Sequence, residues 1–196
     1  KDGNIWIGTQ SGLYFFNAAT RELSPYPIGG HDNQKYDIRS LLLDGDHLWI
    51  GTYAKGIRVV NLRTGAVKVY THSRGIPYTI CSNDVLCFYR GRNGEIYVGT
   101  SWGLCRYDAA KDNFMPIINI GSMISITDMH EDMYNHLWIA TSSSGVFTYN
   151  TINGHYKNYQ HEREDSTTIT SNSIITLFED VKGTMWFGTN GGGLCS

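Results

Sequence analysis

The phrase Trp49-Ile50-Gly51-Thr52 decides the fold, because it recurs with small changes along the whole chain. Each copy has an aromatic ring, a small residue two positions later and then threonine. The copies are Trp6-Ile7-Gly8-Thr9, Trp49-Ile50-Gly51-Thr52, Tyr97-Val98-Gly99-Thr100, Trp138-Ile139-Ala140-Thr141 and Trp186-Phe187-Gly188-Thr189. The ring stands at positions 6, 49, 97, 138 and 186, and a period of roughly 40–50 residues is typical of four-stranded β-propeller blades.

The residues around each copy predict four strands per repeat, which we name A to D from the inner channel to the rim. Strand A is an apolar run such as Ile38 to Leu43, and a pair such as Asp44-Gly45 favours a tight hairpin into strand B. Strand B carries the aromatic phrase, strand C follows a second phrase such as Gly56-Ile57, and strand D follows a polar turn. We expect an all-β propeller fragment over residues 1–196, with repeats at approximately 2–43, 44–90, 91–131, 132–179 and, in part, 180–196.

The recurrent ring and the small residue behind it have a packing explanation. A ring at the start of strand B can lie between neighbouring blades, and a glycine two residues later leaves room for the next sheet. We therefore expect a structural role, and no ligand, for Trp6, Trp49, Tyr97, Trp138, Trp186, Gly8, Gly51, Gly99 and Gly188.

Composition excludes several classes of protein. With 41% hydrophobic and 17% charged residues, the chain is not disordered. A net charge of −2 gives no basic surface for nucleic acid, and no apolar stretch approaches the ~20 residues that span a bilayer. The four cysteines show no metal-binding spacing, so we interpret them as small buried side chains, with a Cys81–Cys87 pair left open.

A second set of positions adds a family resemblance. Residues 169–194 contain Ser171-Asn172 before strand A, Glu179-Asp180 after it, and then the aromatic and glycine phrases. Ser82-Asn83 and Glu131-Asp132 preserve parts of the same pattern, whereas Tyr97 and Ala140 depart from it. Together these positions resemble the two-component regulator propeller repeat, and the resemblance covers essentially the whole chain.

The resemblance implies a function and a location. Members of this family look like periplasmic sensor regions of hybrid two-component systems, in which propellers precede a membrane helix and a cytoplasmic histidine kinase. Many such sensors respond to oligosaccharides, so a glycan is the implied ligand. A complete ring in the family has about seven blades. We therefore expect a fragment that contacts the remaining blades and domains of its sensor, and whose open blade edges favour self-association.

The expected ligand site lies on the face formed by the B–C turns and the D–A loops. Tyr53 and Trp102 stand in B–C turns where other repeats have small polar residues. An aromatic ring beside amides and hydroxyls suits a sugar, which has an apolar face and many hydrogen-bonding groups. Tyr78 and Arg74 in a D–A loop, and Asn190 in another B–C turn, complete the candidates.

Two other classes of function remain open. A protein-binding scaffold predicts a large apolar patch on the same face. A propeller lyase predicts His, Tyr, Arg or a metal converging at the channel. The sequence shows no metal-binding motif, nucleophile elbow or paired carboxylates, so we expect no metal, no cofactor and no catalysis in this segment.

Overall fold

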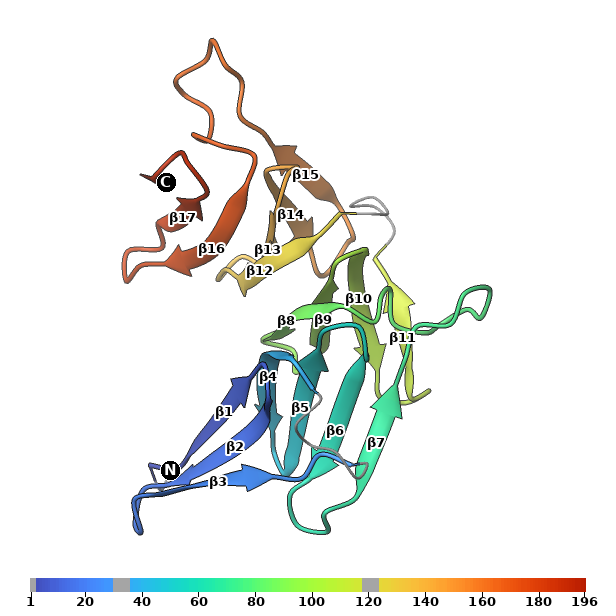
Figure 1. The fold of residues 1–196 in the computed structure, drawn as a ribbon. Helices are drawn as coiled ribbons and strands as arrows, with labels where there is room; N and C mark the ends of the chain where they lie inside the picture. The colour runs from blue at the N-terminus through green and yellow to red at the C-terminus, as the bar shows by residue number, and fades with distance from the viewer. Residues whose placement is uncertain (1–2, 30–35, 118–123) are drawn as a thin grey trace.

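The protein is described here by a computed structural model that places residues 3–29, 36–117 and 124–196. These residues form five antiparallel sheets, which we call blades 1 to 5 (Figure 1). They contain no helix, and therefore none with the length and apolar character that crossing a bilayer requires. The predicted all-β fold is confirmed.

Blades 2, 3 and 4 each have four strands in the order A-B-C-D. They are β4 (Ile38–Asp44), β5 (His47–Thr52), β6 (Ile57–Asn61) and β7 (Val67–Tyr70) in blade 2; β8 (Val85–Arg90), β9 (Ile96–Thr100), β10 (Gly103–Asp108) and β11 (Asn113–Pro116) in blade 3; and β12 (Ile126–Glu131), β13 (His136–Thr141), β14 (Val146–Asn150) and β15 (Tyr156–Tyr159) in blade 4.

Blades 1 and 5 have three strands each among the described residues. They are β1 (Ile5–Thr9), β2 (Gly12–Asn17) and β3 (Glu22–Tyr26) in blade 1, which correspond to B, C and D, and β16 (Ile174–Glu179), β17 (Met185–Thr189) and β18 (Leu194–Cys195) in blade 5, which correspond to A, B and C. Each sequence repeat therefore contains strands B, C and D of one blade and strand A of the following blade.

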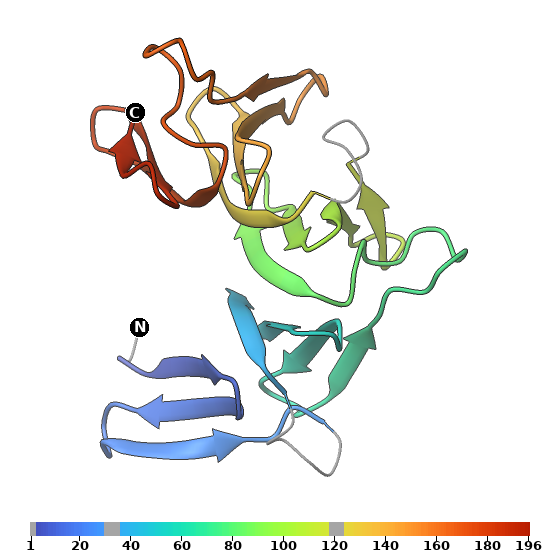
Figure 2. The same cartoon turned by 45° about the horizontal axis from the view of Figure 1, so that its top comes forward.

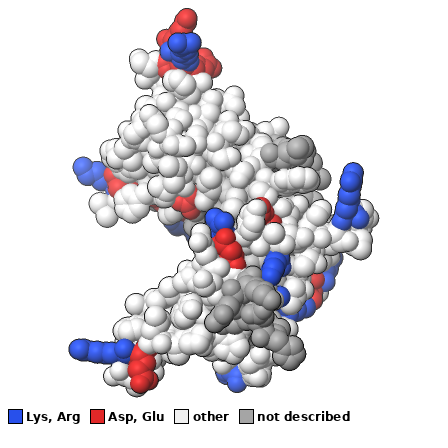
Figure 3. Space-filling view, in the orientation of Figure 1, with Lys and Arg blue, Asp and Glu red and all other residues white. Residues whose placement is uncertain are grey.

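The A strands β4, β8, β12 and β16 lie side by side along the inner edge of an open arc (Figures 1 and 2). Both ends of the chain lie on the open side of this arc, and Figure 3 shows the opening as a notch. On the face in Figure 3, charged side chains of both signs are scattered and leave most of the surface uncharged.

The threonine that ends each aromatic phrase closes the following B–C turn. Its hydroxyl donates a hydrogen bond to the carbonyl of the glycine that opens the next phrase, with oxygen–oxygen distances of 2.7–2.9 Å in all five blades. Each of these glycines has a positive φ, as at Gly56 (70°) and Gly145 (75°), which explains why glycine recurs there. The two recurrent phrases are therefore the two halves of one turn.

The small residue of the phrase brings neighbouring blades close together. A Cβ atom on Gly51 would lie 2.7 Å from Cγ1 of Val85 on β8, and one on Gly99 would lie 2.8 Å from Cγ2 of Ile126 on β12. Both distances are far shorter than van der Waals contact, so glycine sets the spacing between blades 2 and 3 and between blades 3 and 4.

Cys81 and Cys87 pack in two separate clusters. Cys87 packs against the apolar cluster between blades 3 and 4, where its thiol lies 3.6 Å from the carbonyl oxygen of Ile126. Cys81 packs against the cluster between blades 2 and 3, which contains Cys105. The pairing of Cys81 with Cys87 that the sequence left open is therefore wrong, because the two side chains belong to different interfaces.

Candidate functional site

Two exposed aromatic residues stand on neighbouring B–C turns. Tyr53, between β5 and β6, is 52% exposed, and Trp102, between β9 and β10, is 58% exposed. The recurrent rings of the fold behave differently, since Trp49 is only 4% exposed and Tyr97 only 1%. Tyr53 and Trp102 therefore present aromatic surface that the packing of this segment does not cover.

Asp84, just before β8, ties these two turns together. Its carboxylate accepts a hydrogen bond from the N–H of Ala54 at 3.0 Å, and its carbonyl accepts one from the N–H of Ser101, also at 3.0 Å. The hydroxyls of Ser82 and Ser101 are 3.0 Å apart. We call Tyr53, Trp102, Asp84, Ser82 and Ser101 the aromatic platform, in which one acidic residue fixes the spacing of two turns.

Tyr53 is oriented by groups at the start of β4. Its N–H donates to the carbonyl of Asp37 at 2.8 Å. The guanidinium of Arg39 lies 5.2 Å from the centre of the Tyr53 ring, a cation–π distance, and forms a 2.9 Å ion pair with Asp37. Arg39 occupies a β-bulge, because the pairing with β5 shifts register between Ile38 and Ser40. A bulge re-aims a side chain, and here it accompanies an arginine that reaches the platform.

The remaining sequence candidates lie elsewhere. The carbonyl of Tyr78 accepts a hydrogen bond from the N–H of Phe114 at 2.9 Å, which ties its loop to the outer strand β11. Tyr78 borders a cavity of about 340 Å³ beside Asp112, and Arg74 is exposed in the same loop. Asn190 is exposed in the B–C turn of blade 5. Only Tyr53 and Trp102 of the five candidates belong to the platform.

The two longest described D–A loops share an internal frame that sequence reasoning missed. The side-chain oxygen of Asn83 accepts from the N–H of His72, and that of Asn172 accepts from the N–H of His161, both at 2.7 Å. Each histidine ring nitrogen Nδ1 lies 2.8 Å from an isoleucine carbonyl oxygen in its own loop. The Ser-Asn pair of the repeat is therefore a loop anchor.

Asp84 and Arg39 were also missed, although the sequence carries a signal for Arg39. Arg39 corresponds to Leu86, Thr127 and Ile175, so a charge stands at this bulge position in one repeat only. Asp84 corresponds to Asp37, Ser125 and Ser173, so an acidic residue at this position recurs in blade 2 and does not distinguish Asp84.

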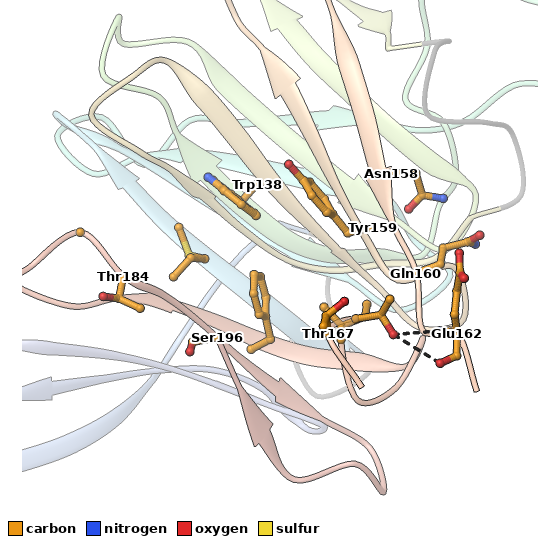
Figure 4. A pocket seen from close by; sticks show the side chains of 13 residues that line it. Trp138, Asn158, Tyr159, Gln160, Glu162, Thr167, Thr184 and Ser196 are labelled. Carbon is orange, nitrogen blue, oxygen red and sulfur yellow. Dashed lines mark hydrogen bonds between the residues drawn. The ribbon is translucent and has the colours of Figure 1, made fainter. Parts of the chain in front are cut away.

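A cavity of about 590 Å³ lies between blades 4 and 5. Figure 4 shows Trp138 and Tyr159 on one wall, facing Thr184 and Ser196 of the blade 5 segment. The corresponding space between blades 2 and 3 is occupied by Tyr107 and Phe114, which contact Trp49 and Tyr70. This cavity therefore coincides with an interblade packing position, and we place the candidate ligand site at the platform.

Metal chemistry finds no support in the part of the chain that the structure describes. Within residues 3–29, 36–117 and 124–196, no group of three His, Cys, Asp or Glu side chains is placed to hold a metal ion. His130 is paired with Glu179 across the inner strands, with Nε2 and Oε2 2.8 Å apart. His31 lies outside the described residues.

An arc of radial antiparallel sheets whose inner strands line an axis defines a β-propeller. Residues 168–191 match the model of the two component regulator propeller family. The resemblance seen in the sequence is thus confirmed at these residues, which carry a two-component regulator propeller repeat.

Two further comparisons point in the same direction. Histidine kinase P4 of Formosa agariphila is 35% identical over 75 residues, which cover 38% of this chain and 5% of that protein. The extracellular domain of a putative hybrid two component system from B. thetaiotaomicron superposes with a TM-score of 0.81 at 25% identity. That match covers 97% of this chain and 24% of the other, so this chain spans only a small part of each relative.

A third comparison concerns the fold alone. Virginiamycin B lyase from Staphylococcus aureus superposes with a TM-score of 0.71 over all of this chain and 66% of the enzyme. The two sequences are 14% identical. Because a fold hosts many functions, this likeness transfers no catalytic activity to the chain.

Proposed function

We propose that the chain is a segment of the periplasmic sensor region of a hybrid two-component regulator, and that its aromatic platform binds an oligosaccharide. The observation that carries the sensor assignment is the superposition of 97% of the chain on the extracellular domain of a putative hybrid two component system. The repeat match at residues 168–191 supports the same assignment. The role is recognition, with histidine kinase activity in another part of the full protein.

The chemistry of the platform supports a glycan as its ligand. The exposed rings of Tyr53 and Trp102 offer flat apolar faces for the C–H groups of sugar rings. The carboxylate of Asp84 and the hydroxyls of Ser82 and Ser101 offer acceptors and donors for sugar hydroxyls. Because Asp84 accepts hydrogen bonds from the backbone of both turns, the turns that carry the two rings are held in place, and binding would cost little backbone conformational entropy.

The position of the platform also suits the coupling of ligand binding to signalling. It joins blades 2 and 3, so a ligand that contacts both turns favours one arrangement of these blades over others. Ile5 and Leu23 on blade 1, and Phe178 and Leu194 on blade 5, are exposed apolar side chains at the two ends of the arc. These side chains support contacts with the remaining blades and domains of the sensor, or self-association of this segment.

Calorimetry on the complete sensor region, titrated with a panel of oligosaccharides, tests the proposal. We expect sub-millimolar binding of at least one glycan, and at least a tenfold loss of affinity in Tyr53→Ala and Trp102→Ala. Tyr134→Ala is the matched control, because Tyr134 is 68% exposed but lies in an A–B turn on the opposite face. Absence of any glycan binding would refute ligand recognition. Equal losses in all three variants would refute the location.

A further inference from the structure

Two cysteines from different parts of the chain meet inside the interface between blades 2 and 3. Cys105 lies on β10 and is fully buried in the apolar cluster that contains Trp49 and Ile57. Cys81, half-buried at the end of the D–A loop, packs against this cluster. The side chain of Cys81 interacts with the thiol of Cys105, and Sγ of Cys105 lies 3.8 Å from the carbonyl oxygen of Val98. The two cysteine side chains therefore meet at one apolar cluster, although a whole A–B hairpin separates them in the chain.

The environment makes the two thiols chemically unequal. Burial raises the pKa of the Cys105 thiol well above its usual range. The hydrogen bond with Cys105 lowers the pKa of Cys81, which is also the more accessible of the two. Since the thiolate is the reactive form, Cys81 is suited to attack an external disulfide and Cys105 is suited to resolve the product.

We propose that Cys81 and Cys105 form a redox-active pair that closes to a disulfide by exchange with a small-molecule or protein disulfide, and so fastens the D–A loop to blade 3. The Cys81 thiolate attacks one sulfur of the oxidant, whose S–S bond breaks and releases one thiolate. That thiolate takes the proton of Cys105. The Cys105 thiolate then attacks Sγ of Cys81 and releases the second thiolate. Two cysteine thiols are oxidised, and one external disulfide is reduced to two thiols.

The bond would act on the platform through the short segment that follows Cys81. Ser82 and Asp84 belong to the platform, and Asn83 anchors the loop through the N–H of His72. A covalent tie at Cys81 would therefore restrict both the loop that carries Tyr78 and the turns that carry Tyr53 and Trp102. Disulfides form outside the cytoplasm, where the proposed function places the chain, but the exchange itself does not depend on glycan binding.

Blade 5 supplies an internal control. Gly193-Leu194-Cys195 repeats Gly103-Leu104-Cys105, and Ile169-Thr170-Ser171-Asn172 repeats Ile80-Cys81-Ser82-Asn83. Cys195 packs against the cluster between blades 4 and 5, as does Ile169. Blade 5 therefore has Cys195 at the position of Cys105, and Thr170 at the position of Cys81.

The test is incubation of the native protein with oxidised glutathione, alkylation of free thiols in denaturant and mass spectrometry of unreduced peptides. We expect a cross-link between Cys81 and Cys105, free thiols at Cys87 and Cys195, and a thermal midpoint about 5 °C or more above that of the reduced protein. Thr170→Cys should add a second cross-link, to Cys195. A Cys81–Cys87 bond, glutathione retained on Cys81, or full alkylation of Cys81 and Cys105 would each overturn the proposal.

Two serine variants separate this outcome from a general effect on folding. Cys105→Ser should leave Cys81 as a mixed disulfide with glutathione, whereas Cys87→Ser should form the Cys81–Cys105 bond as the native protein does. Circular dichroism of the reduced variants checks that each one folds. If Cys105→Ser does not fold, the peptide map of the native protein still decides between the cross-link and its absence.

Discussion

The interface between blades 2 and 3 and the interface between blades 4 and 5 have equivalent side chains on their first blade but differ in the side chains of their second blade. Trp49 stacks on Tyr70 with ring centroids 6.1 Å apart, and Trp138 stacks on Tyr159 with centroids 5.8 Å apart. A lysine lies over each tyrosine, Lys68 at 5.2 Å and Lys157 at 4.3 Å. The leading blade therefore presents nearly the same surface at both interfaces.

The two interfaces differ in the side chains that the following blade contributes. At the first interface the ring centroids of Tyr107 and Trp49 are 4.9 Å apart in an edge-to-face arrangement, and those of Phe114 and Tyr70 are 5.1 Å apart. At the second interface a cavity of about 590 Å³ borders Trp138. The recurrent phrase thus prepares a binding surface for the next blade, and strands C and D of that blade decide how completely it is filled.

The largest expected effect is a difference in stability between two tryptophan truncations. Trp49→Ala should lower the free energy of unfolding by about 3–5 kcal/mol, because it removes a ring that is only 4% exposed. Trp138→Ala should cost about 2 kcal/mol, including the lost hydrogen bond from Nε1–H to Asp132. Urea denaturation followed by circular dichroism measures both. Equal losses would mean that the two interfaces are equally filled in solution.

An intermediate effect is expected from exchanging the small residues at these interfaces. Gly51→Ala should cost about 1–3 kcal/mol, because its Cβ would lie 2.7 Å from Val85 and 3.1 Å from Phe88. Ala140 is fully buried in the same position of blade 4, where the smaller Leu177 replaces Phe88. Ala140→Gly should cost about 1–2 kcal/mol from the lost methyl group and added backbone freedom. If Gly51→Ala were neutral in urea denaturation, glycine would not set the blade spacing.

The sequence predicted the fold well because the signal is repeated and local. The period of the aromatic phrase and the hairpin residues gave the strands almost at their observed positions, with the expected Ile38 to Leu43 observed as Ile38–Asp44. Such patterns depend on alternation along one strand and on turn residues, both of which can be read without knowing the neighbouring blade.

Less of the candidate site could be predicted from the sequence. The bridge from Asp84 to two turns, the reach of Arg39 from a bulge and the meeting of Cys81 with Cys105 all join segments of different blades. Such contacts depend on how the blades are spaced and on a register shift within β4, neither of which leaves a periodic pattern. Tyr53 and Trp102 were proposed from the repeat, and their ligand role stays a prediction.

The smallest expected effect concerns Asp112, which ties blade 3 to blade 2. Its carboxylate is paired with the ammonium of Lys68 and accepts hydrogen bonds from Tyr70 at 2.5 Å and Tyr107 at 2.8 Å. These contacts, that of Lys68 first, lower its pKa to about 2, from about 3.9 in an unfolded chain. Ionised Asp112 therefore stabilises the fold above about pH 4, and this contribution is lost as the pH falls from about 4 to about 2.

Asp112→Asn should accordingly lower stability at pH 7 by less than about 1 kcal/mol, because the side chain is 43% exposed and its charge is screened by water. The difference from the native protein should shrink toward zero at pH 2. A double-mutant cycle with Tyr70→Phe isolates the contact between the blades, and Tyr159→Phe, at the same place in blade 4, is the matched control. A constant difference from pH 7 to pH 2 would show that the charge of Asp112 does not hold the blades together.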